Sequence, residues 1–210
     1  MATFADMAPS VLQNLPQCPQ PVVESYLLRA MADFCRKSYA WVETLAAVAV
    51  LPAAFPYAIV PDGAGEKVVA VFGVEVDGGD PLEKVTIPYL DVNVFDWKTA
   101  TGTPTMFTEG PAGTIRLISI PESSVSLVST IAVEPSTVAT VLPDDLVREN
   151  KDTIVSGAIS LLALIPKMPW FSLEFASFHG GLFNQGVAVA RRDFNLHQKH
   201  ATMVTSPSPI

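Results

Sequence analysis

The order of hydrophobic patterns along the chain constrains its fold more than any short motif. One helical stripe comes first, about ninety residues of strand-like sequence follow, and two helical stripes and a polar tail complete the chain. In all three stripes the apolar residues recur at the i, i+3, i+4 spacing of amphipathic helices. Because an amphipathic helix cannot bury its apolar face alone, we expect the N-terminal helix to pack against the two C-terminal helices.

This order predicts an α+β protein with an inserted β region. Residues 21–44 and 143–194 are expected to form a three-helix core, and residues 45–142 a small antiparallel β-sandwich or barrel extruded from it. Residues 1–20 form an N-terminal arm, which holds a short helix at most and then a linker. Residues 195–210 lose the helical periodicity and are rich in Ser and Pro, so we expect an extended C-terminal tail.

Short β-type segments at roughly ten-residue spacing favour a sandwich or barrel for the insert. The segment Val68–Val76 alternates and ends at Asp77-Gly78-Gly79, which is a strong turn signal. The other expected strands are Leu45–Leu51, Val85–Val94, and a pair formed by Ile115–Ile118 and Val125–Val133.

Local signals also mark the helix ends. Pro21 suits the first turn of a helix that should run to about Val42. Pro143 with the acids that follow opens a second helix, which should end at Ile165 before Pro166. Ser172 is expected to cap the last helix.

Composition and charge limit the function classes. The chain is 49% apolar and 16% charged, with a net charge of −8. This is ample for a core, and the excess of apolar side chains favours an oligomer. Residues 60–110 carry nine acids against three lysines, so most of the negative charge lies in the β insert. Such an acidic protein should not grip nucleic acid through its phosphates, although DNA could slide past an acidic wall.

The cysteine count and the N-terminal sequence bear on location. With only Cys18 and Cys35 we expect reduced thiols in a cytosolic setting rather than a disulfide framework. No basic region followed by an apolar region opens the chain, so we expect no secretory signal. The longest uncharged run, residues 44–61, contains three prolines and should not cross a membrane.

No motif for catalysis or cofactor binding survives inspection. The segment Asp62-Gly-Ala-Gly-Glu-Lys67 lacks the phosphate-loop spacing and favours a hairpin turn. The triplet His179-Gly180-Gly181 lies in a helical stripe, where small residues suit a helix crossing better than an oxyanion hole. The three histidines have the wrong spacing for zinc. We interpret Asp91 and Asp96 as exposed acids on a sheet rim, next to Trp97, which is expected to be packed. We therefore expect no enzyme activity, cofactor or metal.

Several segments, in their order along the chain, resemble the head-to-tail adaptor (connector) proteins of tailed bacteriophages. The resemblance covers most of residues 21–195. It is carried by Ala32-Asp-Phe-Cys-Arg-Lys-Ser38 before Trp41, Gly113-Thr-Ile-Arg-Leu117, Glu134-Pro-Ser136, Leu142-Pro-Asp-Asp-Leu146, Ser156-Gly-Ala158, Pro166-Lys-Met-Pro-Trp170 and Phe183-Asn-Gln-Gly-Val-Ala188. One departure is the Gly180-Gly181 pair, which thins the middle of the last helix and could let it bend.

The resemblance implies a structural virion protein at the portal vertex, made in the cytoplasm of the bacterial host. It implies a ring, commonly of twelve subunits, that joins the portal protein to a downstream tail or nozzle protein and forms part of the DNA channel. The genomic DNA would pass through without specific binding, and no membrane is involved. It further implies that the C-terminal extension holds the portal. The expected contact residues are Leu196, His197, Met203, Val204, Pro207, Pro209 and Ile210.

Other readings of the sequence stay open. The chain could be another neck component, such as a stopper or tail-completion protein. A different class is a cytosolic β-sandwich binding module carried on a helical stalk, and an enzyme is a third. The mass of the free chain and its behaviour with purified portal would separate these readings.

Overall fold

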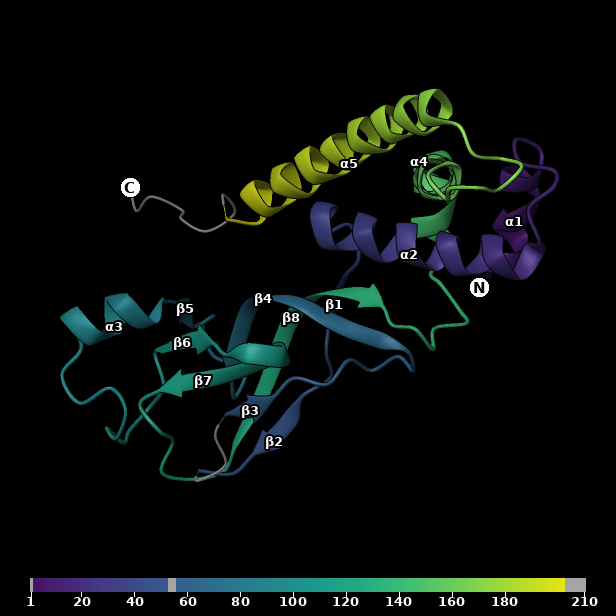
Figure 1. Ribbon diagram of the computed structural model, residues 1–210. Coiled ribbons are helices and arrows are strands. Elements are labelled where there is room, and N and C mark those ends of the chain that lie inside the picture. The colour runs from purple at the N-terminus through teal and green to yellow at the C-terminus, as the bar shows by residue number, and fades with distance from the viewer. Residues whose placement is uncertain (1, 53–55, 203–210) are drawn as a thin grey trace, which may run out of the picture. The chain divides into compact units, whose positions relative to one another are not determined.

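The computed structural model describes residues 2–52 and 56–202, and the chain forms two compact units. Unit 1 comprises Met1–Trp41 and Glu134–Ile210, and unit 2 comprises Val42–Val133. The predicted α+β class with an inserted β unit is confirmed (Figure 1). The insert ends earlier than residue 142, because backbone hydrogen bonds of 3.2 and 3.0 Å join Ala2 and Leu142 and hold the returning chain in unit 1.

Unit 1 contains a helix, α1 (Phe4–Leu12), in what we expected to be an arm. Thr3 and Asp6 form a capping box at its start, in which the Asp6 N–H donates to Thr3 Oγ1 at 3.3 Å and the Thr3 N–H donates to Asp6 Oδ2 at 2.9 Å. Its buried face, which includes Met7 and Val11, packs against α2 and α4. The helical core therefore has a fourth member.

The helix α2 (Gln20–Ser38) carries the predicted apolar stripe, whose residues are buried. Pro21 lies in its first turn as expected. The helix ends before Val42, because Tyr39 adopts a left-handed conformation with φ 57° and its N–H caps the carbonyl of Cys35. Residues beyond this point enter unit 2, where Val42–Thr44 forms the strand β1.

The helices α4 (Asp144–Ala163) and α5 (Leu173–Thr202) complete unit 1, and α4 contacts both α2 and α5 (Figure 1). Ser172 caps α5 as predicted, since its hydroxyl accepts the N–H of Phe175 at 3.3 Å. The two helices approach closely at small residues. A Cβ added to Gly157 would lie 2.6 Å from the ring of Phe183, and one added to Gly186 would collide with Thr153.

Unit 2 is built from two four-stranded sheets. In the first, β8 (Val125–Pro135) pairs with β1, with β2 (Val48–Val50) and with β4 (Glu66–Val76). The second has the order β3 (Tyr57–Ala58), β7 (Thr114–Ile118), β6 (Met106–Glu109), β5 (Glu83–Lys84). The β5–β6 pair is parallel, whereas the β3–β7 and β6–β7 pairs are antiparallel. A short 3-10 helix, η1 (Pro111–Gly113), lies between β6 and β7.

Two predictions for the insert were wrong. The segment Val85–Val94 does not continue a sheet, because Ile87–Asn93 forms the helix α3, with Pro88 in its first turn and only Leu90 buried. The segments that hold β7 and β8 do not pair with each other but belong to different sheets. The chain changes direction between them near Ser119, whose φ is 63°.

The structure also corrects the start of the expected C-terminal tail. α5 continues past Phe194 to Thr202, so residues 195–202 are helical rather than extended. The sequence of residues 195–202 is mostly polar and hides the helical periodicity, but it contains no proline that would end a helix.

Candidate functional site

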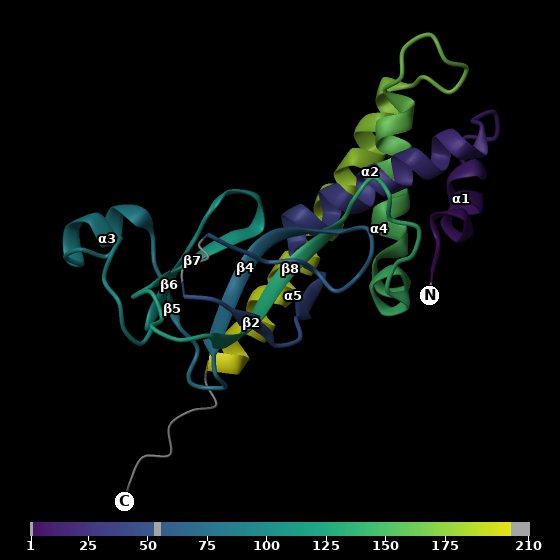
Figure 2. The ribbon, with the colours of Figure 1, turned by 90° about the horizontal axis from the view of Figure 1, so that it is seen from below.

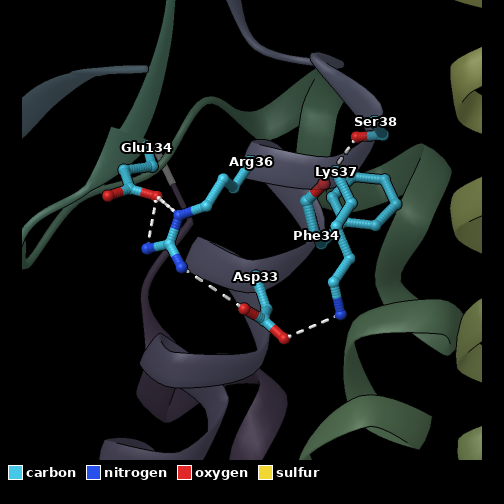
Figure 3. Close-up of polar contacts among 6 residues, drawn as sticks. All are labelled: Asp33, Phe34, Arg36, Lys37, Ser38 and Glu134. Atoms are coloured by element: carbon cyan, nitrogen blue, oxygen red, sulfur yellow. Dashed lines mark hydrogen bonds and ion pairs between the residues drawn. The ribbon is translucent and has the colours of Figure 1, made fainter.

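A polar cluster joins α2 to the point where the chain re-enters unit 1 (Figure 3). Arg36 donates from Nε and Nη2 to Glu134 Oε2 at 2.9 and 2.8 Å. Its Nη1 lies 3.5 Å from Asp33 Oδ1, and the other oxygen of Asp33 lies 3.0 Å from Lys37 Nζ. We call these four residues the re-entry clamp. It connects two of the segments that carry the family resemblance, although they lie far apart in the sequence.

The clamp places a buried carboxylate inside unit 1. The side chain of Glu134 is only 5% exposed, whereas that of Arg36 is 54% exposed. The same environment acts on the neighbouring thiol, since burial and then the Glu134 charge raise the pKa of Cys35 to about 12. A thiol with such a pKa stays protonated and unreactive at neutral pH. The clamp is therefore a structural device without a reactive group.

The turn between α4 and α5 projects beyond the two helices (Figure 2) and carries exposed apolar side chains. Its exposed side chains include those of Leu164, Lys167, Met168, Phe171 and Leu173. Hydrogen bonds of 3.0 Å from Phe171 N–H to the Met168 carbonyl and from Ser172 N–H to the Ala163 carbonyl fix the turn. Lys167 adopts a left-handed conformation with φ 65°. We call these five residues the helical tip.

A groove of about 460 Å³ lies between α4 and α5, away from the tip. Leu182 and Val189 form its apolar wall and are 40% and 45% exposed. Glu149, Asp152 and Asp193 supply carboxylates to its lining. We call these five residues, together with Gly186 and Ala190 of α5, the α4–α5 groove.

The outward face of α5 extends the apolar wall beyond the groove in both directions. Phe178 and Leu196 are 62% and 49% exposed. With Leu182 and Val189 they fall within about 40° around the helix axis, because α-helical residues advance by about 100° each. Leu182, Val189 and Leu196 repeat every seven residues, which is the spacing of helices that pack on another helix. This exposed stripe is typical of an interaction surface.

The expected portal-contact residues fall into two groups. Leu196 and His197 lie on α5, where Leu196 is exposed. Met203, Val204, Pro207, Pro209 and Ile210 lie outside the described residues.

Unit 2 has its own exposed apolar patch, on α3 and the turn that follows it. Val92 and Phe95 are 83% and 91% exposed. The turn is held rigidly, because Trp97 is buried and donates from Nε1 to Asp91 Oδ1 at 3.0 Å. The guanidinium of Arg116 lies 4.7 Å from the Trp97 ring centroid. The sequence did not indicate this patch, because the pattern of Val85–Val94 favours a strand whereas Ile87–Asn93 is helical.

The structure shows where the motifs that were rejected as catalytic lie in the fold. The loop at Asp62 leads into a strand, not a helix. Asp91 accepts a hydrogen bond from Trp97 Nε1 at 3.0 Å, and Asp96 adopts a left-handed conformation with φ 52°. His179 lies inside α5, edge-on to Phe175 and Phe178, with its pKa lowered by burial. Among the described residues no three His, Cys, Asp or Glu side chains form a group that could hold a metal ion.

No family model matches the chain, and no curated protein matches it. Within the described part of the chain, no helix combines the length and apolar character needed to cross a membrane.

Proposed function

We propose that the chain is a structural virion protein, a subunit of the adaptor ring that links the portal to the tail of a bacteriophage and forms part of the DNA channel. In this role it performs no catalysis and needs no cofactor. Its partners are other copies of itself, the portal protein and a downstream tail or nozzle protein. It would be made in the bacterial cytoplasm and reside at the portal vertex.

The observation that carries this proposal is the order of the segments that resemble the adaptor family. Contacts within unit 1 join several of these segments, although residues 113–117 lie in unit 2. Arg36 and Glu134, from two of them, form the re-entry clamp. Gly157 and Phe183, from two others, meet where α4 crosses α5. A set of residues that builds one helical core supports the resemblance better than scattered similarities would.

Exposed apolar surface on unit 1 supports the ring. The helical tip and the stripe on α5 both leave large side chains in water, which is unusual for a chain that functions alone. A cyclic ring needs two different faces on each subunit, because each copy must present one face to each neighbour. Unit 1 offers two such faces at different places.

Charge supports the passage of DNA without binding. Unit 2 carries eleven acids and four bases, and unit 1 carries ten acids and nine bases. An acidic wall repels phosphates, so DNA that enters the channel would not be held. We propose that unit 2 meets the downstream protein, with Val92 and Phe95 as anchors, and that residues 203–210 contribute to portal attachment.

Purified portal rings provide the test. The full chain, a chain truncated after Thr202 and a Val92→Ser/Phe95→Ser variant would each be mixed with portal and examined by electron microscopy. The full chain and the unit 2 variant should add a ring to the portal, and the truncated chain should bind much more weakly. Because the truncation leaves the described helices intact, circular dichroism should be unchanged. A full chain that adds no density to the portal would refute the proposal and favour a binding module.

A further inference from the structure

The helical tip and the α4–α5 groove differ in shape but match in chemistry. The tip presents apolar side chains around the cation Lys167, the exposed Glu174 follows Leu173 in the first turn of α5, and hydrogen bonds fix the backbone of the turn. The groove offers an apolar wall of Leu182 and Val189, together with the carboxylates of Glu149 and Asp152. The apolar tip with its positive charge is therefore complementary to the apolar groove with its negative rim.

The two surfaces cannot meet within one copy. Asp152 lies eleven residues before the end of α4 at Ala163, which is about 16 Å of helix. Val189 lies sixteen residues after the start of α5 at Leu173, about 24 Å along that helix. The tip is the rigid turn that joins these two helices, so it has no slack to fold back onto the groove. Any occupant of the groove with the chemistry of the tip comes from another molecule.

We propose that the helical tip of one copy inserts into the α4–α5 groove of a second copy. Met168 and Leu173 contact the wall formed by Leu182 and Val189, and Lys167 lies against the carboxylates of Glu149 and Asp152. The contact joins different surfaces of the two copies, so one copy of a pair keeps a free groove and the other keeps a free tip. Each subunit can therefore bind two neighbours. This inference rests on the proposed ring and assigns the faces through which the subunits associate.

The choice of a second copy rests on complementarity within a single sequence. A tip docked against itself would bring Lys167 against Lys167, and a groove docked against itself would bring acids against acids. Like charges placed together at an interface oppose association. Tip-to-groove contact alone brings opposite charges together while it covers exposed apolar side chains of both surfaces. A specific contact should bury on the order of 800 Å² on each partner, which needs neighbouring residues as well.

The test uses the purified full chain and its mass in solution across a concentration series. The tip variant is Met168→Ser/Leu173→Ser and the groove variant is Leu182→Ser/Val189→Ser. The matched control is Val138→Ser, which changes a side chain that is 73% exposed on another part of unit 1. The wild type and the control should self-associate with rising concentration. Each of the two variants alone should associate at least tenfold more weakly.

Mixing the two variants distinguishes this contact from a symmetric one. The tip variant keeps an intact groove and the groove variant keeps an intact tip, so the mixture should form one-to-one pairs and no larger species. Charge reversal gives a second test, because Lys167→Glu and Asp152→Lys should each weaken association and the double variant in one chain should restore it. Circular dichroism and thermal unfolding of every variant confirm that it is folded.

Three results would overturn the inference. These are a wild type that stays monomeric at every concentration, a mixture of the variants that does not pair, and association that survives both variants. The proposed function is judged separately by portal binding. A monomeric chain that still forms a ring on the portal would retire the tip-to-groove contact and keep the adaptor function. A chain that pairs through tip and groove but ignores the portal would do the reverse.

Discussion

Removing the guanidinium of Arg36 should destabilise unit 1 more than the loss of an exposed arginine usually does. In the Arg36→Met variant the aliphatic stem remains, but the two donors to Glu134 Oε2 at 2.8 and 2.9 Å are lost. The Glu134 carboxylate is 5% exposed and would be left in a poorly hydrated site. Breaking a buried pair from one side costs about 3–5 kcal/mol.

The magnitude must be reduced for solvent. Arg36 itself is 54% exposed, so water can enter the space that the guanidinium leaves and hydrate part of the carboxylate. We therefore expect the free energy of unfolding to fall by about 2 kcal/mol, which lies within the range of hydrogen bonds to charged groups. Arg36→Lys should lose part of the same energy, because a single ammonium does not reproduce two donors in a plane.

Urea unfolding followed by far-UV circular dichroism measures this change, since in the described residues nearly all the helix belongs to unit 1. The matched control is Arg148→Met, which removes a pair with Asp145 in which both side chains are exposed, 72% and 80%. It should change stability by no more than about 0.5 kcal/mol. If Arg36→Met and Arg148→Met have the same stability, the clamp does not hold the re-entering chain and the reasoning is refuted.

Three further predictions concern unit 1. Gly157→Ala should destabilise unit 1 by about 1–2 kcal/mol, because the added Cβ would lie 2.6 Å from the Phe183 ring. Gly181→Ala should instead stabilise α5 by about 0.5–1 kcal/mol, because an added Cβ would meet nothing within 4 Å; urea unfolding measures both changes. Burial lowers the pKa of His179, so the unfolded chain binds a proton that the folded chain does not, and stability should fall as pH drops below about 6.5. The difference in unfolding free energy between wild type and His179→Phe should therefore depend on pH between about 5 and 6.5, before most carboxylates titrate, and a constant difference would refute this assignment. Phe34→Asp should unfold the helices of unit 1, since Phe34 is 0% exposed and an unpaired buried charge costs several kcal/mol; a soluble, fully helical variant would contradict the packing.

Periodicity predicted the long elements well, because their burial is one-sided. The buried residues of α2, from Val23 to Ser38, recur at helical spacing, so this spacing alone indicated the helix. The alternating segment that forms β4 and the turn before α5 were predicted on similar local grounds. The Ser172 cap was also predictable, since the hydroxyl of a serine just before a helix commonly accepts a backbone N–H of the first turn.

The remaining errors come from interactions that a local pattern does not contain. α3 buries only Leu90, so it has no stripe that periodicity could detect. Which strands pair depends on contacts between distant segments, and β8 finds partners from β1, β2 and β4 rather than from its neighbour β7. The pairing of Arg36 with Glu134 could not be predicted, because the two residues are 98 positions apart and no local pattern links them. The tip and the groove became visible only when the exposure of each side chain was known.

The central claim is that the chain is a subunit of a ring that docks on a portal. Electron microscopy of the full chain mixed with purified portal rings tests this claim most directly. The account predicts an added ring on one face of the portal, with a central channel continuous with the portal channel and a mass of several subunits per portal. Portal rings that remain bare in the presence of excess folded chain would contradict it.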